Sequence, residues 1–197
     1  MVRISKLIAL MLVSVLLLGG CSRSGSGSGS EPTDEYADKI EAAGVNVYPY
    51  YDLPASLEEL IEKNSPDIAA TIKVVSRGES YKMATSYEIE LGEVYLGDVG
   101  SGDRLTLVTD YSIYDGETYR TDGSTVFRGG SEYLVFLNGC SMDELVPEAG
   151  NSEMVYFVCP PPRGVIKISG EYTPTGLFES YKTLSELKKG VSELCKN

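Results

Sequence analysis

The sequence predicts an α+β fold, in which a small, bent and partly closed antiparallel β-barrel of five to six strands is flanked by two or three helices. Three observations lead to this prediction. Apolar residues alternate with period two in several short segments, that alternation changes parity at a glycine, and capping residues precede segments with helical period. Residues 53–197 are expected to form one domain, because about 145 residues can bury a single core.

Six short segments have the period-two pattern of strands. In the second segment the apolar positions change parity at Gly92-Glu93. Only an inserted residue can keep one face apolar across such a change, so a β-bulge or sharp bend is expected there, as in small barrels. The expected strands cover residues 68–74, 87–96, 105–107, 133–137, 154–158 and 165–168.

Two helices are predicted from capping boxes. Ser56 with Glu59, and Thr183 with Glu186, place a hydroxyl acceptor three residues before a carboxylate. An apolar stripe follows each pair, so one helix is expected before the first strand and another at the end of the chain.

Residues 33–52 are expected to lead into this domain. Helical spacing that starts at Tyr36, with a stop at Gly44, predicts a helix over residues 33–43. An extended segment draped on the domain is expected after it, and its tyrosines are Tyr48, Tyr50 and Tyr51.

The N-terminal residues resemble a bacterial lipoprotein signal. Residues 1–20 contain two basic residues, an apolar run and a glycine pair, which is the layout of a secretory signal peptide, and about a dozen apolar residues are too few to span a membrane. Cys21 follows directly, as in a lipobox, and this resemblance implies that its thiol carries the lipid. Residues 21–32 are therefore expected to be a lipidated cysteine with a flexible Ser/Gly tether. The alternative is an ordinary signal peptide followed by a chance cysteine.

The composition of the sequence argues against some classes of function. The sequence has 17 Lys+Arg, 29 Asp+Glu and no histidine, and removal of residues 1–20 takes away two basic and no acidic residues, so the net charge changes from −12 to −14. Such a chain repels polyanions, which argues against nucleic-acid binding. The absence of histidine removes the usual general base and the commonest metal ligand. No cofactor, metal site or catalytic residue is therefore expected.

A family resemblance lies in four strand segments, residues 67–75, 87–98, 102–107 and 130–137. They resemble uncharacterised bacterial surface lipoproteins and, more distantly, the OB-fold domain shared by tissue inhibitors of metalloproteinases and netrins. The resemblance implies an OB-like barrel. In those inhibitors a free N-terminal cysteine packed on the barrel chelates the protease zinc, whereas the first cysteine here resembles a lipidated one and lies far from the first strand. Metalloprotease inhibition therefore does not carry over, and the fold alone indicates no ligand.

The connection between the third and fourth strands is the candidate binding segment. Residues 110–130 place aromatic side chains among Asp, Gly, Thr and Ser, a composition typical of paratopes and sugar-binding loops. The candidate binding residues are Tyr111, Tyr114, Tyr119 and Phe127. At least half of them are expected to pack on the barrel, and the others to form the binding surface.

The same segment is rich in acidic residues. Asp110, Asp115, Glu117 and Asp122 lie within thirteen positions but lack the spacing of a calcium-binding loop, so we interpret them as a solvated acidic loop.

Three cysteines remain after the one in the signal. Cys140 and Cys159 are expected at opposite ends of a hairpin, too far apart for a disulfide, so any bridge would use Cys195.

The sequence favours a binding or accessory module that is anchored outside the cytoplasm of a bacterium by a lipid on Cys21. An envelope protein or a glycan is the expected kind of partner. Two alternatives remain open, an inhibitor of an exported enzyme and a hydrolase that uses two carboxylates in one cleft.

Overall fold

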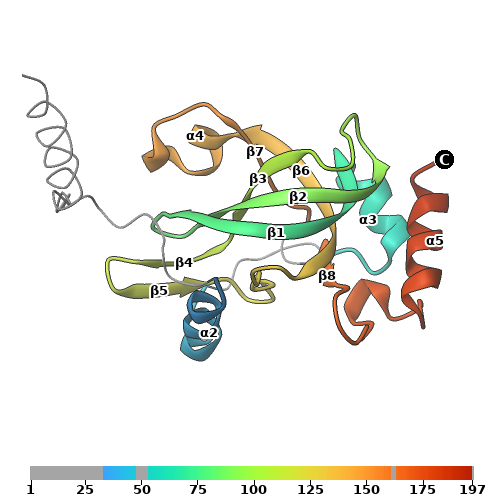
Figure 1. The fold of residues 1–197 in the computed structure, drawn as a ribbon, viewed down its shortest axis with the longest axis horizontal. Coiled ribbons are helices and arrows are strands. Elements are labelled where there is room, and N and C mark those ends of the chain that lie inside the picture. Colours follow the sequence, from blue (N-terminus) through green and yellow to red (C-terminus); the bar gives the residue numbers. More distant parts are fainter. Residues whose placement is uncertain (1–32, 48–52, 161–162, 197) are drawn as a thin grey trace, which may run out of the picture.

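The computed structural model describes residues 33–47, 53–160 and 163–196 (Figure 1). The expected signal peptide, Cys21 and the tether, as well as Tyr48, Tyr50 and Tyr51, lie outside these residues. The helices are α2 (Thr33–Ala43), α3 (Leu57–Asn64), α4 (Met142–Leu145) and α5 (Leu184–Leu194), with 3-10 turns η1 (Pro147–Ala149) and η2 (Gly176–Phe178). The strands are β1 (Ile68–Ser80), β2 (Thr85–Leu96), β3 (Arg104–Thr109), β4 (Tyr111–Tyr114), β5 (Glu117–Arg120), β6 (Glu132–Ser141), β7 (Met154–Val158) and β8 (Val165–Lys167).

Five strands form a closed barrel (Figure 1). Their order is β1-β2-β3-β7-β6, β6 pairs back with β1, and β8 adds a sixth strand that pairs with β6. This architecture confirms the predicted α+β class. The antiparallel prediction fails at one pair, because β3 and β7 are parallel. Strand β3 runs in the direction of β1, because two antiparallel pairings, β1–β2 and β2–β3, separate them. Strand β7 also runs in the direction of β1, because the antiparallel pairings β1–β6 and β6–β7 separate them.

The predicted β-bulge lies in β2. Across Gly92-Glu93, a two-residue step on β1 is matched by a three-residue step on β2. The Glu93 N–H donates to Thr71 Oγ1 at 2.8 Å, and this hydroxyl occupies the place that a Cβ at position 92 would need. Glycine at the bend therefore lets the two strands approach closely.

The first five residues of β1 are all buried, although the alternation predicted a half-buried strand. One face points into the barrel, and the other contacts a second apolar layer outside it. We call this layer the outer cluster, and α3, α5, β8 and η2 build it against β1 and β6. Its buried residues are Leu57, Leu60, Ala69, Leu134, Phe136, Ile166, Ile168, Leu177, Phe178, Leu187 and Val191.

Both long helices of the outer cluster begin at the predicted caps. At α3 the Glu59 N–H donates to Ser56 Oγ (3.2 Å), while the Glu59 carboxylate accepts from the Ala55 N–H (2.6 Å). At α5 the box is complete, because the Glu186 N–H donates to Thr183 Oγ1 and the Thr183 N–H donates to Glu186 Oε2, both at 3.2 Å. These bonds satisfy N–H groups that lack partners within a helix.

Helix α2 spans the predicted residues and packs on the barrel beside β4 and β5. Tyr36 and Ile40 are buried in the same apolar core as the barrel interior. The Tyr36 hydroxyl bonds to Thr85 Oγ1 (2.7 Å) in β2 and accepts from the Ile113 N–H (2.8 Å) in β4. The same hydroxyl also bonds to Ser80 Oγ (3.0 Å) at the end of β1, so one tyrosine joins α2 to three strands.

A second attachment of α2 is electrostatic. The Arg128 guanidinium pairs with Asp38 and with Glu41, each at 2.8 Å. The guanidinium of Arg77 also lies 4.1 Å from the centre of the Tyr36 ring, within the range of a cation–π contact. Helix α2 is therefore held to the loop that follows β5 as well as to β1.

Residues 110–130, expected as one long connection, contain the hairpin β4–β5. Tyr111 pairs with Arg120 and Tyr114 with Glu117. The turn is Asp115-Gly116, and both residues have positive φ, 52° and 80°. An Asp-Gly dipeptide in this conformation is the preferred two-residue hairpin turn, so the dipeptide was an available signal for the hairpin.

Strands β6 and β7 pair as the predicted hairpin. Cys140 lies opposite Val155, whereas Cys159 follows β7 and its N–H donates to the Phe136 carbonyl at 2.8 Å. The two cysteines therefore occupy opposite ends of the paired segment. Both are free thiols in the structure, as is Cys195.

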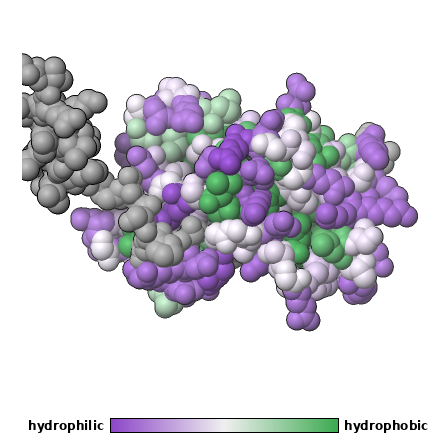
Figure 2. Space-filling model, in the orientation of Figure 1, coloured by the Kyte–Doolittle hydropathy of each residue, from purple (hydrophilic) through white to green (hydrophobic). Residues whose placement is uncertain are grey.

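The surface is mainly hydrophilic on the face that Figure 2 shows, with a weakly hydrophobic area around α4. No helix within the described ranges combines the length and apolar character that crossing a bilayer requires. The exposed large apolar side chains of the described residues are Val75, Met83, Tyr114, Leu145 and Met154.

Candidate functional site

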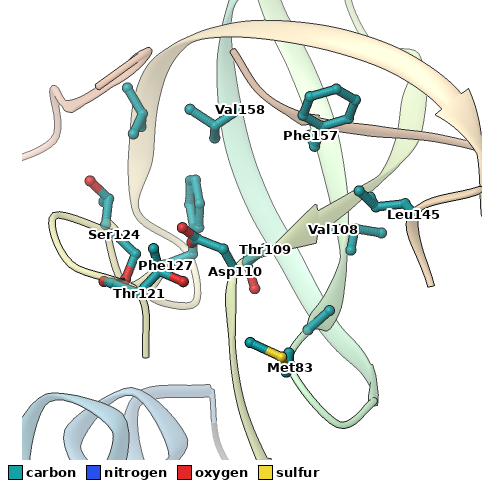
Figure 3. A pocket seen from close by; sticks show the side chains of 13 residues that line it. Met83, Val108, Thr109, Asp110, Thr121, Ser124, Phe127, Leu145, Phe157 and Val158 are labelled. Carbon is teal, nitrogen blue, oxygen red and sulfur yellow. Dashed lines mark hydrogen bonds between the residues drawn. The ribbon is translucent and has the colours of Figure 1, made fainter. Parts of the chain in front are cut away.

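A cavity lies where the parallel pair β3–β7 ends. The two strands pair only over residues 107–108 and 156–157. Beyond them a space of about 250 Å³ separates the strand ends (Figure 3). We call it the Asp110 cavity, and its lining residues are Met83, Ala84, Val108, Thr109, Asp110, Thr121, Ser124, Thr125, Phe127, Leu145, Phe157, Val158 and Val165.

Six separate segments contribute to this lining. They are the end of β3, the loop after β5, the turn between β1 and β2, helix α4, β7 and the start of β8. Most of the side chains are apolar or carry a single hydroxyl. Asp110 is the one ionisable residue among the described residues of the wall, and in Figure 3 it lies between Met83 at one end and Val158 at the other.

Asp110 is a largely buried carboxylate. Burial raises its pKa from the ordinary 3.8 to about 6, and the charge of Arg120 and a hydrogen bond from the Thr121 side chain oppose this rise without cancelling it. The Oδ2 atom is buried and has no hydrogen-bond partner within the described chain. A carboxylate in this state destabilises the fold at neutral pH, so a site that keeps it is a candidate for function.

The backbone around Asp110 is fixed on both sides. Thr109 and Tyr111 are buried, and the Thr109 hydroxyl donates to the Thr85 carbonyl at 3.0 Å. The Thr121 N–H donates to the Asp110 carbonyl at 3.2 Å. The carboxylate is therefore carried by a rigid strand junction rather than by a free loop.

The mouth of the cavity is formed by short elements. Met83 and Leu145 line it and remain 47% and 37% exposed. Met83 lies in the β1–β2 turn, which is closed by the Tyr81 N–H donating to the Ala84 carbonyl at 2.7 Å. Leu145 is the last residue of α4, a single turn without a side-chain hydrogen bond at its N-cap.

The four predicted binding aromatics separate into two pairs. Tyr111 and Phe127 are buried in the barrel core, where the Phe127 N–H donates to the Tyr111 hydroxyl at 2.8 Å, and Phe127 also reaches the cavity wall. Tyr114 and Tyr119 lie on the hairpin. Tyr114 is 45% exposed, and the Tyr119 hydroxyl donates to Glu117 at 2.8 Å.

The acidic residues of the segment also separate. Asp115, Glu117 and Asp122 are exposed, whereas Asp110 is not. Within the part of the chain that the structure describes, no three carboxylates or cysteines come together as a metal site. The four acidic residues are close in the sequence, but one carboxylate is largely buried and the other three are in contact with solvent.

Sequence reasoning missed the cavity and most of its wall. It placed Asp110 with the acidic loop, and it gave no role to Met83, Leu145 or Phe157. One signal was present. Asp110 lies three positions after the predicted strand 105–107 and precedes an aromatic residue, so its carboxylate is the one charged group in residues 105–114.

No family model matches the sequence, and no curated protein sequence matches it significantly. Function therefore has to be inferred from the cavity and from the N-terminal signals. A cavity with one carboxylate suits binding better than glycoside hydrolysis, because hydrolysis by carboxylates requires two of them in one cleft.

Proposed function

We propose that the protein is a lipid-anchored, extracytoplasmic binding module that holds a small ligand in the Asp110 cavity. The signal-peptide layout of residues 1–20 and Cys21, which resembles a lipobox cysteine, support this location. One observation carries the binding function, namely a mainly apolar cavity whose described lining has a single buried carboxylate, with one oxygen that has no partner in the described chain. Ligand sites generally combine an apolar wall with a few polar groups that orient the ligand.

The volume limits the size of the ligand. An apolar cavity of about 150 Å³ takes up benzene, so about 250 Å³ accommodates roughly ten non-hydrogen atoms. A compact ring with a short side chain fits this limit. A long acyl chain or an oligosaccharide would extend through the mouth between Met83 and Leu145.

A second candidate function is an interaction with an envelope protein. Tyr114, 45% exposed near the tip of the β4–β5 hairpin, is the observation that favours it, because tyrosine is common among interface anchors. Such a contact would use the hairpin and leave the cavity free for a ligand.

The cavity function can be tested by binding of small aromatic probes. Phenethylamine, phenethyl alcohol and phenylacetate would be titrated into the Cys21→Ala protein, and backbone amide shifts would be followed by NMR. We expect at least one probe to shift the resonances of residues 108–110 and 124–127 in a saturable manner.

A filling variant supplies the control. Ala84→Leu adds apolar volume at the wall and should abolish the shifts, whereas Ala42→Leu makes the same change on an exposed face of α2 and should preserve them. No saturable shift with any of the three probes, or shifts that survive in Ala84→Leu, would refute the cavity as a ligand site.

The anchor can be tested by fractionation. If Cys21 is acylated, Cys21→Ala should move the protein from the membrane fraction to the soluble fraction, because each buried CH₂ of the lipid contributes about 0.8 kcal/mol to attachment. A variant that stays with the membrane would contradict lipid anchoring at this residue.

A further inference from the structure

We propose that the ligand of the Asp110 cavity carries a protonated primary or secondary amine beside a compact apolar group, and that the amine pairs with Asp110. This inference rests on the proposed binding function and names the class of ligand. Three properties of the cavity lead to it.

The first property is an uncompensated acceptor. Within the described ranges, Asp110 Oδ2 is buried without a hydrogen-bond partner, and the cavity wall contains no lysine or arginine. Arg120 acts on Asp110 as a nearby charge, and no ion pair joins the two side chains within the described residues. The Arg120 guanidinium donates to the Ser124 carbonyl at 3.4 Å, and its Nε atom is buried without a partner in the same part of the chain. A cation that reached Oδ2 would form a charge-assisted hydrogen bond, about twice as strong as a neutral one.

The second property is the state of the hydroxyls in the wall. The Ser124 hydroxyl donates to the Thr121 carbonyl at 2.8 Å, and the Thr109 hydroxyl donates to the Thr85 carbonyl at 3.0 Å. Their protons are already used, so both oxygens keep only acceptor lone pairs. Together with the Asp110 carboxylate, these two hydroxyls give the wall three groups that can accept, which suits an ammonium group with several donors and opposes a carboxylate or phosphate.

The third property is the apolar character of the rest of the cavity wall. Phe127 and Phe157 supply aromatic rings, and Met83 and Val158 supply aliphatic surface. These side chains favour a hydrocarbon body, and aromatic rings also attract cations. The net charge of −14 on the chain after residue 20 raises the local concentration of cations around the domain. A small amine with an aryl or branched alkyl group satisfies all of these conditions.

The test compares three probes of nearly equal size and different charge. Phenethylamine is a cation, phenethyl alcohol is neutral and phenylacetate is an anion at about pH 7.5. In the Cys21→Ala protein, we expect the NMR-derived Kd of phenethylamine to be at least about tenfold lower than that of the alcohol, and phenylacetate to bind weakest.

Two variants assign this preference to Asp110. Asp110→Asn keeps the shape of the side chain and removes its charge, so the amine and the alcohol should then bind within about threefold of each other. Asp115→Asn removes the same charge from the exposed hairpin turn, where asparagine tolerates the positive φ, and should preserve the preference.

The outcomes separate the two proposals. Equal or tighter binding of the alcohol or of phenylacetate would overturn the amine inference and leave a cavity that binds ligands. A preference for the amine that persists in Asp110→Asn would overturn the role of Asp110. Absence of binding by all three probes would refute the ligand site and the inference together.

Discussion

Helices cover the barrel over β1 and β6 and again over β3 and β7, and the packing is more complete at the first place than at the second. Over β1 and β6, α3 and α5 have eight and eleven residues, and each begins with a side-chain cap. Over β3 and β7, α4 has four residues and no side-chain cap bond. Leu60, Leu187 and Val191 are fully buried under the first cover, whereas about 250 Å³ remains open beside the second.

The difference shows how this fold makes room for a ligand. A helix of two or three turns presents an apolar stripe long enough to follow a strand, and its cap fixes where the stripe begins. A single turn covers only one or two strand residues. The Asp110 cavity lies beyond the end of α4, where β3 and β7 stop pairing. It exists because no helix of the described chain packs over the ends of these two strands.

The largest change in the free energy of unfolding is expected in the outer cluster, under α3 and α5. Leu187→Ala should lower the free energy of unfolding by about 2 to 5 kcal/mol, because it removes buried apolar surface and leaves a void. Leu145→Ala makes the same chemical change at the cavity mouth, where the side chain is 37% exposed, and should cost less than about 1 kcal/mol. Urea unfolding measures both values, and equal losses would contradict the comparison.

A substitution inside the cavity is expected to stabilise the fold. Asp110→Asn should raise the free energy of unfolding by about 1 to 3 kcal/mol at neutral pH, because it removes a buried charge. The difference between a pKa of about 6 and the ordinary 3.8 corresponds to about 3 kcal/mol, and burial of the amide reduces the gain.

The destabilisation by Asp110 should depend on pH. The folded-state pKa of Asp110 lies above the unfolded value, so the penalty is complete above about pH 7, falls as pH passes through about 6 and is absent below about 3.8. Arg120 is the charged neighbour that opposes the shift. The variant and the wild type should therefore converge near pH 4 in urea unfolding at a series of pH values. A stabilisation that persists there, or an equal one in Asp115→Asn, would show that the buried charge is not its source.

The smallest effect is expected on the hairpin. Tyr114→Ala should change the free energy of unfolding by less than about 0.5 kcal/mol, because the side chain is 45% exposed and contributes little to the core. Its affinity for a partner protein should fall by at least about 1 kcal/mol if the hairpin is an interface. Thermal unfolding and a pull-down with the Tyr114→Ala protein measure the two quantities. A loss of stability with intact binding would make Tyr114 part of the core.

Elements with a local cause were predictable from the sequence. The caps at Ser56 and Thr183 lie within four residues of the groups that they bond, and the bulge at Gly92 follows from parity within one strand. The barrel class followed from several such local patterns. The parallel pair β3–β7 was not predictable in this way, because it depends on where the chain returns after β6.

The candidate site was predictable only in part. Aromatic composition drew attention to residues 110–130, and this segment does contribute Asp110, Ser124 and Phe127 to the wall. Met83, Leu145 and Phe157 come from distant segments, and only the tertiary fold brings them together. A cavity also forms where neighbouring side chains are too small or too distant to fill a space, and no pattern in the sequence shows this.

If the protein is held at Cys21, as we propose, the attachment of helix α2 has a mechanical consequence. A pull on the residues before Thr33 acts on α2 before it reaches the barrel, since α2 is the first helix of the described chain. Tyr36 resists that pull through its bond to the Ile113 N–H, and β4, which contains Ile113, begins one residue after Asp110. Tension that detached Tyr36 would loosen the strand that fixes the carboxylate. A force applied before Thr33 would therefore reach the surroundings of the cavity through the Tyr36 hydroxyl, and also through the ion pairs of Arg128 with Asp38 and Glu41.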